Sequence, residues 1–244
     1  SSRFIDGVKQ DVETWERKLH LIDQVLDEWL YCQRNWRYLQ NIFTVPDIQK
    51  QLPSEAADFR HVDTKWKDIM AKTANNPNVV ECTTAPGVLE MFLDNRTLLQ
   101  TVQRSLDDYL ETKRMAFARF YFLSDDELLQ ILSQTKEPKA VQPHLNKLFV
   151  GIRRLQFGSA GGSVLAQIDA MISAEGETVN FDQEVVISKT TNVEDWLNTV
   201  QSRMVQTLRN RTRVAYYSLT GLNGVAMRTT QPDDEWSEDR KEWL

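Results

Sequence analysis

The sequence is poor in the residues that break helices or staple small folds together. Its 244 residues include only nine glycines, seven prolines, two cysteines and three histidines. So few glycines and prolines disfavour a turn-rich β-sandwich or barrel and favour long helices. Two cysteines, Cys32 and Cys82, are too few for a disulfide framework and indicate a reducing compartment with free thiols. These scarcities predict a mainly helical protein.

Membrane and nucleic-acid partners are also disfavoured. There is no run of about 18–20 apolar residues, as a membrane-spanning helix needs, and the first residues do not resemble a signal peptide. The chain has 29 Lys and Arg against 35 Asp and Glu, a net charge of −6, whereas a nucleic-acid binder needs a basic face. Since the sequence has no initiator methionine, we expect it to be a piece of a longer protein.

Apolar residues spaced three or four apart predict a first amphipathic helix over about the first forty residues. The stripe consists of Phe4, Val8, Val12, Trp15, Leu19, Ile22, Leu26, Trp29 and Trp36. At ~1.5 Å per residue, this helix would approach 55–60 Å in length. Further helices are expected over 54–72 and 86–117. The third has a heptad pattern through Phe92, Leu99 and Leu106, but its broad apolar face favours a bundle helix over a two-stranded coiled coil.

The second half of the chain has a different pattern. Ser124 with Glu127, and Thr191 with Glu194, have the spacing of helix capping boxes, and the second pair would start a long helix from about residue 192. Between them, alternating residues from 164, a turn at 174–177 and a returning segment predict a β-hairpin over about 164–187, with 185–187 as a possible third strand. We therefore divide the chain into residues 1–122 and 123–244, mainly α with a small β-hairpin insertion after residue 160.

No catalytic, cofactor-binding or metal-binding site is predicted. No phosphate-binding P-loop is present: the glycine-dense stretch 158–163 lacks its lysine, precedes a strand and fits a flexible connector better. The three histidines are too scattered to form a zinc site with one another or with a cysteine. The basic run 209–213 fits a solvated helix face, with docking to an acidic partner surface as the alternative. Nothing indicates an autonomous enzyme.

Specific strings of residues carry more information than these motifs. They occupy Trp29–Phe43, Asp47–Pro53, Trp66–Met70, Arg119–Leu129, Ala140–Leu145, Met171–Glu177 and Val193–Leu197. In this order and spacing they resemble the linker region of dynein heavy chains. The resemblance covers nearly the whole sequence, and the string that begins at Arg119 and runs through Phe120, Tyr121 and Phe122 is its most specific part.

The resemblance implies an elongated, bent helical rod that joins the cargo-binding tail of a microtubule motor to its ring of AAA+ modules. In that family the linker bends and straightens with the nucleotide state of the ring and delivers the power stroke. ATP and Mg²⁺ would bind in the ring of the parent chain, which this sequence lacks together with the end of the linker. The implied partners are the ring modules, the tail, other dynein subunits and, through the parent chain only, the microtubule.

A lever needs a place to bend and surfaces that contact the ring. Two hinge candidates are the segment with Phe120, Tyr121, Phe122 and Ser124, which we prefer, and the loop with Gly158, Gly161 and Gly162. Candidate ring contacts are Glu175, Gly176 and Glu177 at the hairpin tip, together with Arg209, Arg211 and Arg213 in the basic run.

The string Cys32–Trp36 is more similar to axonemal heavy chains of cilia and flagella than to the cytoplasmic cargo transporter. This implies a cytoskeletal location in the axoneme, and an inner-arm type is a further expectation. A static helical scaffold of spectrin-like type is the alternative function. Such a scaffold should show a repeat of about a hundred residues, and residues 1–120 and 121–244 are not similar to each other.

Overall fold

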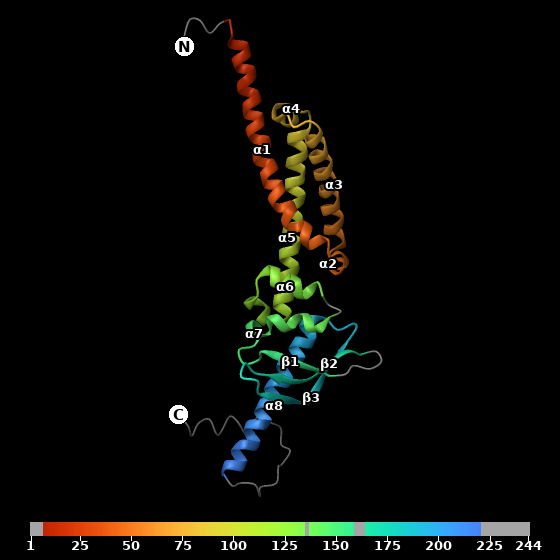
Figure 1. Ribbon diagram of the computed structural model, residues 1–244, viewed down its shortest axis with the longest axis vertical. Coiled ribbons are helices and arrows are strands. Elements are labelled where there is room, and N and C mark those ends of the chain that lie inside the picture. The colour runs from red at the N-terminus through yellow and green to blue at the C-terminus, as the bar shows by residue number, and fades with distance from the viewer. Residues whose placement is uncertain (1–6, 135–136, 159–163, 221–244) are drawn as a thin grey trace.

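The computed structural model describes residues 7–134, 137–158 and 164–220, which form an elongated molecule (Figure 1). One end, the helical part, consists of α1 (Lys9–Phe43), α2 (Pro46–Gln51), α3 (Pro53–Asn75), α4 (Val79–Thr84) and α5 (Val88–Ala116). The other end, the sheet part, consists of η1 (Ala118–Phe122), α6 (Asp125–Leu132), η2 (Pro138–His144), α7 (Leu145–Leu148), β1 (Arg154–Gly158), β2 (Val164–Ile172), β3 (Thr178–Ser188) and α8 (Val193–Thr220). The predicted fold, mainly α with a small β insertion, is confirmed.

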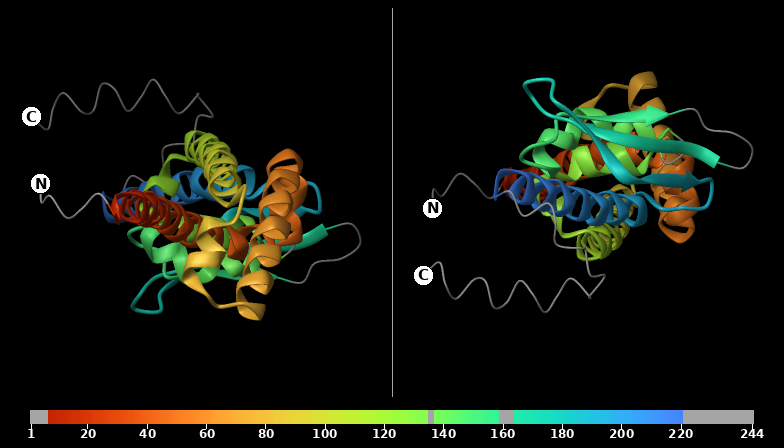
Figure 2. Two further views of the ribbon diagram at one scale, coloured as in Figure 1. Left: turned by 90° about the horizontal axis from the view of Figure 1, so that it is seen from above. Right: turned by 90° about the horizontal axis from the view of Figure 1, so that it is seen from below.

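Aromatic side chains form the centre of the helical part, where α1, α3 and α5 lie as separate rods around a common core (Figure 2). The Trp66 ring of α3 stacks on Trp36 of α1 at 5.3 Å and meets Trp29 edge-on at 6.3 Å. Phe92 of α5 is fully buried, 5.0 Å from the Trp29 ring. The scarcity of helix breakers thus yields long rods, and tryptophans and phenylalanines hold them together.

The predicted apolar face of α5 is confirmed. Its buried residues are Val88, Phe92, Asn95, Leu99, Val102, Leu106 and Leu110. Asn95 is the one polar residue among them; its Nδ2 lies 3.2 Å from the Met91 sulfur, and its Oδ1 has no hydrogen-bond partner. With 29 residues, α5 is long enough to run from the helical part into the sheet part (Figure 1).

The predicted stripe on α1 differs from the face that the bundle buries. The buried residues of α1 begin at Val25 and continue through Cys32 and Leu39 to Ile42 and Phe43. Of the predicted stripe, Trp29 and Trp36 pack at the margin of this core, while the residues from Val8 to Leu26 are exposed or partly buried. Phe4 lies outside the described residues. The helix period is therefore confirmed, but the neighbouring helices cover only the second half of α1.

The β insertion is larger than the predicted hairpin. It is a three-stranded antiparallel sheet of order β1-β2-β3. The segment 185–187, expected as a third strand, continues β3, and the third strand is β1, which precedes the glycine-dense stretch. Phe181, Val185 and Ile187 are all buried along β3, and a register shift in the β2–β3 ladder lies between the Ala170–Asn180 and Ile168–Val185 pairs. The short alternation of Leu155 and Phe157 was the only sequence signal for β1.

The long helix near residue 192 is confirmed, but its predicted capping box is wrong. Helix α8 begins at Val193, and the Thr191 hydroxyl accepts a hydrogen bond from the Ser188 backbone N–H at 3.3 Å. The carboxylate of Glu194 is bound to Lys113 instead of closing a box. The capping spacing was present, but a distant cation competes successfully for the glutamate.

Candidate hinge and interaction surfaces

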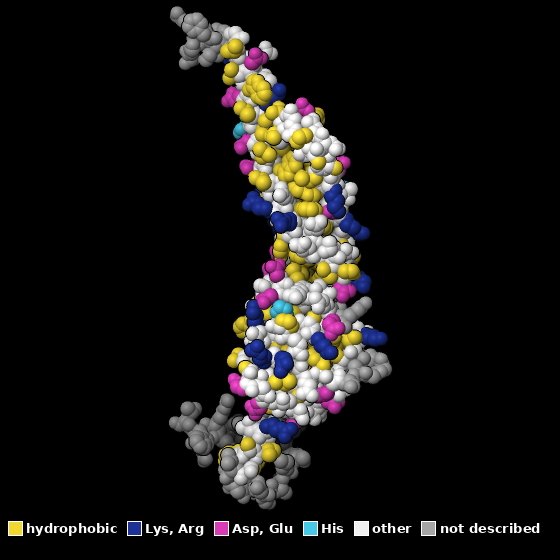
Figure 3. Space-filling view, in the orientation of Figure 1, with side chains coloured by type: hydrophobic (Ala, Val, Ile, Leu, Met, Phe, Trp, Pro, Cys, Tyr) yellow, Lys and Arg dark blue, Asp and Glu magenta, His cyan; other side chains and the backbone are white. Residues whose placement is uncertain are grey.

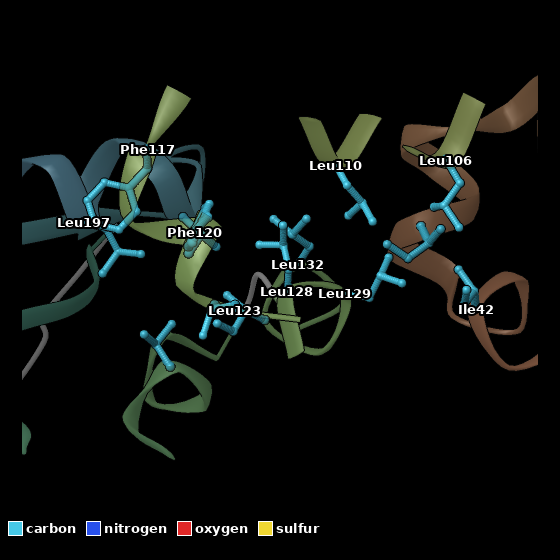
Figure 4. Packing of buried hydrophobic residues seen from close by; sticks show 14 of the residues in the cluster. Ile42, Leu106, Leu110, Phe117, Phe120, Leu123, Leu128, Leu129, Leu132 and Leu197 are labelled. Carbon is cyan, nitrogen blue, oxygen red and sulfur yellow. The ribbon is translucent and has the colours of Figure 1, made fainter. Parts of the chain in front are cut away.

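The helical part and the sheet part meet where α5 ends. Three leucines of α6 lie between a group from the helical part and a group from the start of the sheet part (Figure 4). The first group is Ile42, Leu106 and Leu110; the α6 residues are Leu128, Leu129 and Leu132; the second group is Phe117, Phe120, Leu123 and Leu197. All are buried, so the apolar core continues through this junction.

Polar contacts tie the end of α5 to the start of α8 across the same junction. The Lys113 ammonium lies 2.5 Å from the Glu194 carboxylate, with side chains only 16% and 8% exposed. Asn198 donates a hydrogen bond to the Ala116 carbonyl at 2.9 Å, which satisfies a backbone acceptor at the end of α5. These residues are about 80 positions apart in sequence, and no local signal indicates that they pair.

The preferred hinge segment forms η1 and the start of α6. Phe120 is fully buried and meets Phe117 edge-on at 5.0 Å, whereas Tyr121 and Phe122 are exposed. The Tyr121 hydroxyl donates to Glu111 of α5 at 2.5 Å, and this hydrogen bond raises the pKa of the tyrosine. The segment therefore has an anchored centre with two aromatic rings on its surface.

Ser124, the last residue of the preferred hinge segment, is the N-cap of α6, and its predicted capping box is confirmed. Glu127 accepts a hydrogen bond from Lys147 at 2.6 Å and one from the Ser124 backbone N–H at 3.1 Å. Led by the Lys147 bond, these contacts lower the pKa of Glu127 to about 2. His144 lies 3.7 Å away, with its Nδ1 facing the same carboxylate oxygen. Any bending at Ser124 would have to disturb this charged cluster.

Arg119, directly before the hinge segment, fixes the junction from a second side. Its guanidinium donates to the Gln201 side chain on α8 and to the Leu148 carbonyl, both at 2.8 Å. The same group lies 4.8 Å from the centre of the Phe149 ring. The partners of Arg119 are all 29 or more residues away, so no local pattern in the sequence indicates its role.

A groove of about 400 Å³ lies next to Arg119, between α8, the β2–β3 hairpin and the loop after α7. It is lined by Arg119, Phe149, Val150, Gly151, Ile152, Met171, Ile172, Ser173, Glu177, Val179, Met204 and Leu208. Val150 is wholly exposed at its rim. Glu177, predicted to contact the ring, therefore shares one concave surface with the arginine before the hinge segment.

The other hairpin-tip residues project from the same sheet. Gly176 has φ +88°, which a side chain would strain, and its N–H bonds the Ser173 carbonyl at 3.3 Å. Glu175 is exposed, and a hydrogen bond from its own backbone N–H, supported by Ser173, lowers its pKa. Two carboxylates thus lie at an exposed, tightly closed turn, which suits them for contact with a basic surface.

Gly158 lies in a strand and not in the flexible connector that the sequence predicted. It is the last residue of β1 and pairs with Gln167 of β2. A Cβ at this position would lie 2.2 Å from the Asp169 carboxylate, so that side chain would have to move to admit one. Gly161 and Gly162 lie outside the described residues. The hinge role of these glycines stays a prediction.

The predicted basic run lies on the exposed second half of α8. Arg211 lies 4.0 Å from Asp182 of β3, Arg213 lies 5.8 Å from the Tyr217 ring, and Arg209 is exposed. These arginines do not line the groove that Glu177 lines. Their ring-contact role also stays a prediction.

The described residues hold neither a cluster suited to a metal ion nor a membrane-spanning helix. In 7–134, 137–158 and 164–220 there is no group of three or more acidic, histidine or cysteine side chains arranged to hold a metal ion. Both cysteines are free, and burial raises the pKa of Cys32 to about 12, so its thiol is unreactive. None of the described helices is long and apolar enough to cross a membrane.

Comparison with known proteins identifies the family. Residues 1–215 match the family model described as dynein heavy chain, N-terminal region 2. The chain is 45% identical to dynein axonemal heavy chain 6 of Homo sapiens over 91% of its length, and 44% identical to dynein axonemal heavy chain 2 of Mus musculus over 87%. It is also 47% identical to dynein axonemal heavy chain 1 of Homo sapiens over 80% of its length. The matched segments span only 6%, 5% and 4% of those three relatives. The chain therefore belongs to the dynein heavy chain family.

Proposed function

We propose that this chain is the mechanical linker of an axonemal dynein heavy chain, the lever that bends and straightens over the AAA+ ring during the ATP-driven power stroke. The observation that carries the proposal is the continuous spine of the molecule. Helix α5 passes through the core of the helical part and ends within the sheet part, where Lys113 holds Glu194 of α8. A long helix of this kind can transmit force along its length.

Bending in this proposal is concentrated after α5, within residues 117–124. The junction contains a short 3-10 helix and extended residues, Phe117 and Leu123, on either side of it. A hinge needs only a few residues of this kind to absorb a change in backbone angles. The α6 leucines would then slide between their two neighbouring apolar groups, and the Lys113–Glu194 pair would limit the motion.

The proposed location is the ciliary or flagellar axoneme, which the names of the relatives support. ATP hydrolysis and microtubule binding are assigned to other parts of the parent heavy chain. The hairpin tip and the adjacent groove are the proposed contacts with ring modules, since they combine exposed carboxylates with an apolar concave wall.

Distance measurements in the intact heavy chain test the lever. Fluorescent labels at Lys72 of α3 and Ser202 of α8 report on the junction, and labels at Lys72 and Thr97 of α5 serve as a control within the helical part. The first pair is expected to change its distance between the nucleotide-free and ADP-vanadate states, while the control pair stays constant. Equal distances for the first pair in both states of an active motor would favour the static scaffold.

The ring contact is tested separately in the same motor. Glu175→Gln with Glu177→Gln is expected to slow microtubule gliding, because it removes both charges at the tip without changing its shape. Glu184→Gln, an exposed glutamate further along β3, is the matched control. Unchanged ATPase activity and gliding speed in the double variant would rule out the hairpin tip as a ring contact.

A further inference from the structure

Among the described residues, no neighbouring element covers the first half of α1, and only Leu21 there packs against the core. Between Lys9 and Gln24 no residue is buried, and the first buried residue of the helix is Val25. At ~1.5 Å per residue this free segment is about 24 Å long. Figure 1 shows α1 extending past α4 at the end of the molecule that lies far from α8.

The free segment carries an exposed apolar stripe. Val8, Val12, Trp15, Leu19 and Leu26 are each 40–59% exposed. Figure 3 shows apolar side chains gathered along this part of the molecule and continuing toward α4. A helix this short is marginal in water unless its apolar face packs against something. The exposed stripe is too long and too continuous to be a scatter of single surface residues.

The spacing of the stripe specifies the shape of what covers it. From Val8 to Trp29 the apolar positions advance by 4, 3, 4, 3, 4 and 3 residues, an unbroken 3.5-residue repeat. This repeat is the seam of a coiled coil, whose side chains interlock with those of one partner helix. A sheet or an irregular loop does not match such a period. The occupant is therefore a helix with a complementary apolar seam.

The seam ends in a groove that can receive the end of this helix. A hollow of about 220 Å³ lies between α1 and the region of α3 and α4, with Leu26, Trp29 and Leu30 on the α1 side. Val79, at the start of α4, is exposed on its other wall. The seam and the groove are thus one apolar surface that starts on the free helix and finishes on the bundle.

The charges beside the seam argue against a second copy of the chain. Lys9, Glu16 and Asp23 flank one side of the seam, and Asp11 and Lys18 flank the other. In a parallel pair of copies, Asp11 faces Glu16 of the other copy. In the antiparallel pair with full overlap, Glu16 faces Glu16 and Lys18 faces Lys18. Each arrangement leaves half of the flanking pairs like-charged, which disfavours self-association.

We propose that the stripe is the docking seam for an amphipathic helix of the same heavy chain, one that lies ahead of α1 in sequence and packs antiparallel to it. The relatives are roughly twenty times longer than the matched segment, so heavy chain sequence is available outside it. The seam lies at the end of the rod remote from α8, and a helix ahead of α1 reaches it by a short antiparallel connection. The proposal is independent of whether the rod acts as a lever.

Chemical labelling of the intact, isolated heavy chain tests this proposal. Leu19→Cys places a thiol on the seam, and Gln24→Cys places one on the opposite face of the same free helix. Reaction with a maleimide, followed by mass spectrometry of the α1 peptides, is expected to be at least ~10-fold slower at position 19 than at position 24. Equal rates would overturn the proposal. Protection that appears only on dimerisation, or only when accessory subunits are added, would overturn it as well.

Hydrogen exchange and cross-linking of the unmodified heavy chain keep the test independent of the variants. The amides of residues 12–24 are expected to exchange as slowly as those of the buried half of α1; fast exchange would contradict the proposal. Amine-reactive cross-links from Lys9 and Lys18, which flank the seam, are expected to reach residues ahead of α1 in the same polypeptide. Cross-links that reach only another polypeptide would reject a helix of the same chain.

Discussion

The helical part and the sheet part are held together by different kinds of contact. In the helical part, Trp29, Trp36, Trp66 and Phe92 form one aromatic cluster that joins three long helices. The sheet part has a buried core too, with Phe117 packed against Phe120 and Phe149. Its short elements are joined in addition by strand pairing and by polar links between distant residues, such as Arg119 with Gln201. The buried rings join the three long helices of the helical part into one body. In the sheet part, by contrast, each polar link joins only two residues and can be removed without breaking the others. We expect perturbations of the two parts to differ accordingly.

Removal of the central ring of the helical part should have the largest effect. Phe92 is fully buried between Trp29 and Trp66, so Phe92→Ala leaves a cavity and is expected to lower the free energy of unfolding by about 3–5 kcal/mol. Leu93→Ala, at an exposed neighbouring position, should change it by less than about 0.5 kcal/mol. Urea unfolding monitored by circular dichroism measures both. A loss below 1 kcal/mol for Phe92→Ala would refute the single aromatic core.

The link between the two parts should have the next largest effect. Lys113→Met leaves the Glu194 carboxylate mostly buried without its cation, and we expect a loss of about 3 kcal/mol. Adding Glu194→Leu should recover a large share of the lost unfolding free energy, because no unpaired charge then remains. Hydrogen exchange should show the opening concentrated in the first turns of α8 and the last turn of α5. Equal exchange across both parts would mean that the pair does not connect two separable units.

The same contrast explains how much of the structure was predictable. The apolar repeat of α5 and the Ser124–Glu127 cap are local patterns, and both were predicted correctly. Burial of the α1 stripe could not be decided from its period, because the period is the same whether or not a neighbour covers it. The Lys113–Glu194 pair and the contacts of Arg119 join residues far apart in sequence, so only the folded chain brings them together. Strand β1 was missed because two alternating apolar residues are too weak a signal.

A steric test addresses the sheet part alone. Gly158→Ala places a methyl group against the Asp169 carboxylate, which must move and give up its hydrogen bond from Gln167, and we expect a cost of about 0.5–1.5 kcal/mol. Asp169→Ala in the same chain should recover most of this cost, since the space that the new Cβ needs is then open. The helical part should keep its exchange protection throughout. If Gly158→Ala alone is neutral, the Asp169 carboxylate moves aside without loss and does not constrain this position.

The smallest effect is expected from the cap of α6, and it depends on pH. Glu127 has a pKa lowered from 4.5 to about 2, so its charged form is favoured by the fold. The stabilisation is therefore fully present above pH 4.5 and is lost as the pH falls toward 2. Glu127→Gln removes the charge at every pH, so the difference in unfolding free energy between the two proteins should shrink steadily over this range. The same pH series on Glu90→Gln, an exposed glutamate in the first turn of α5, is the control. A constant difference between the parent protein and Glu127→Gln from pH 6 to 2 would show that Lys147 and Ser124 do not bind the carboxylate in solution, and the charged cluster beside the proposed hinge would then place no limit on its bending.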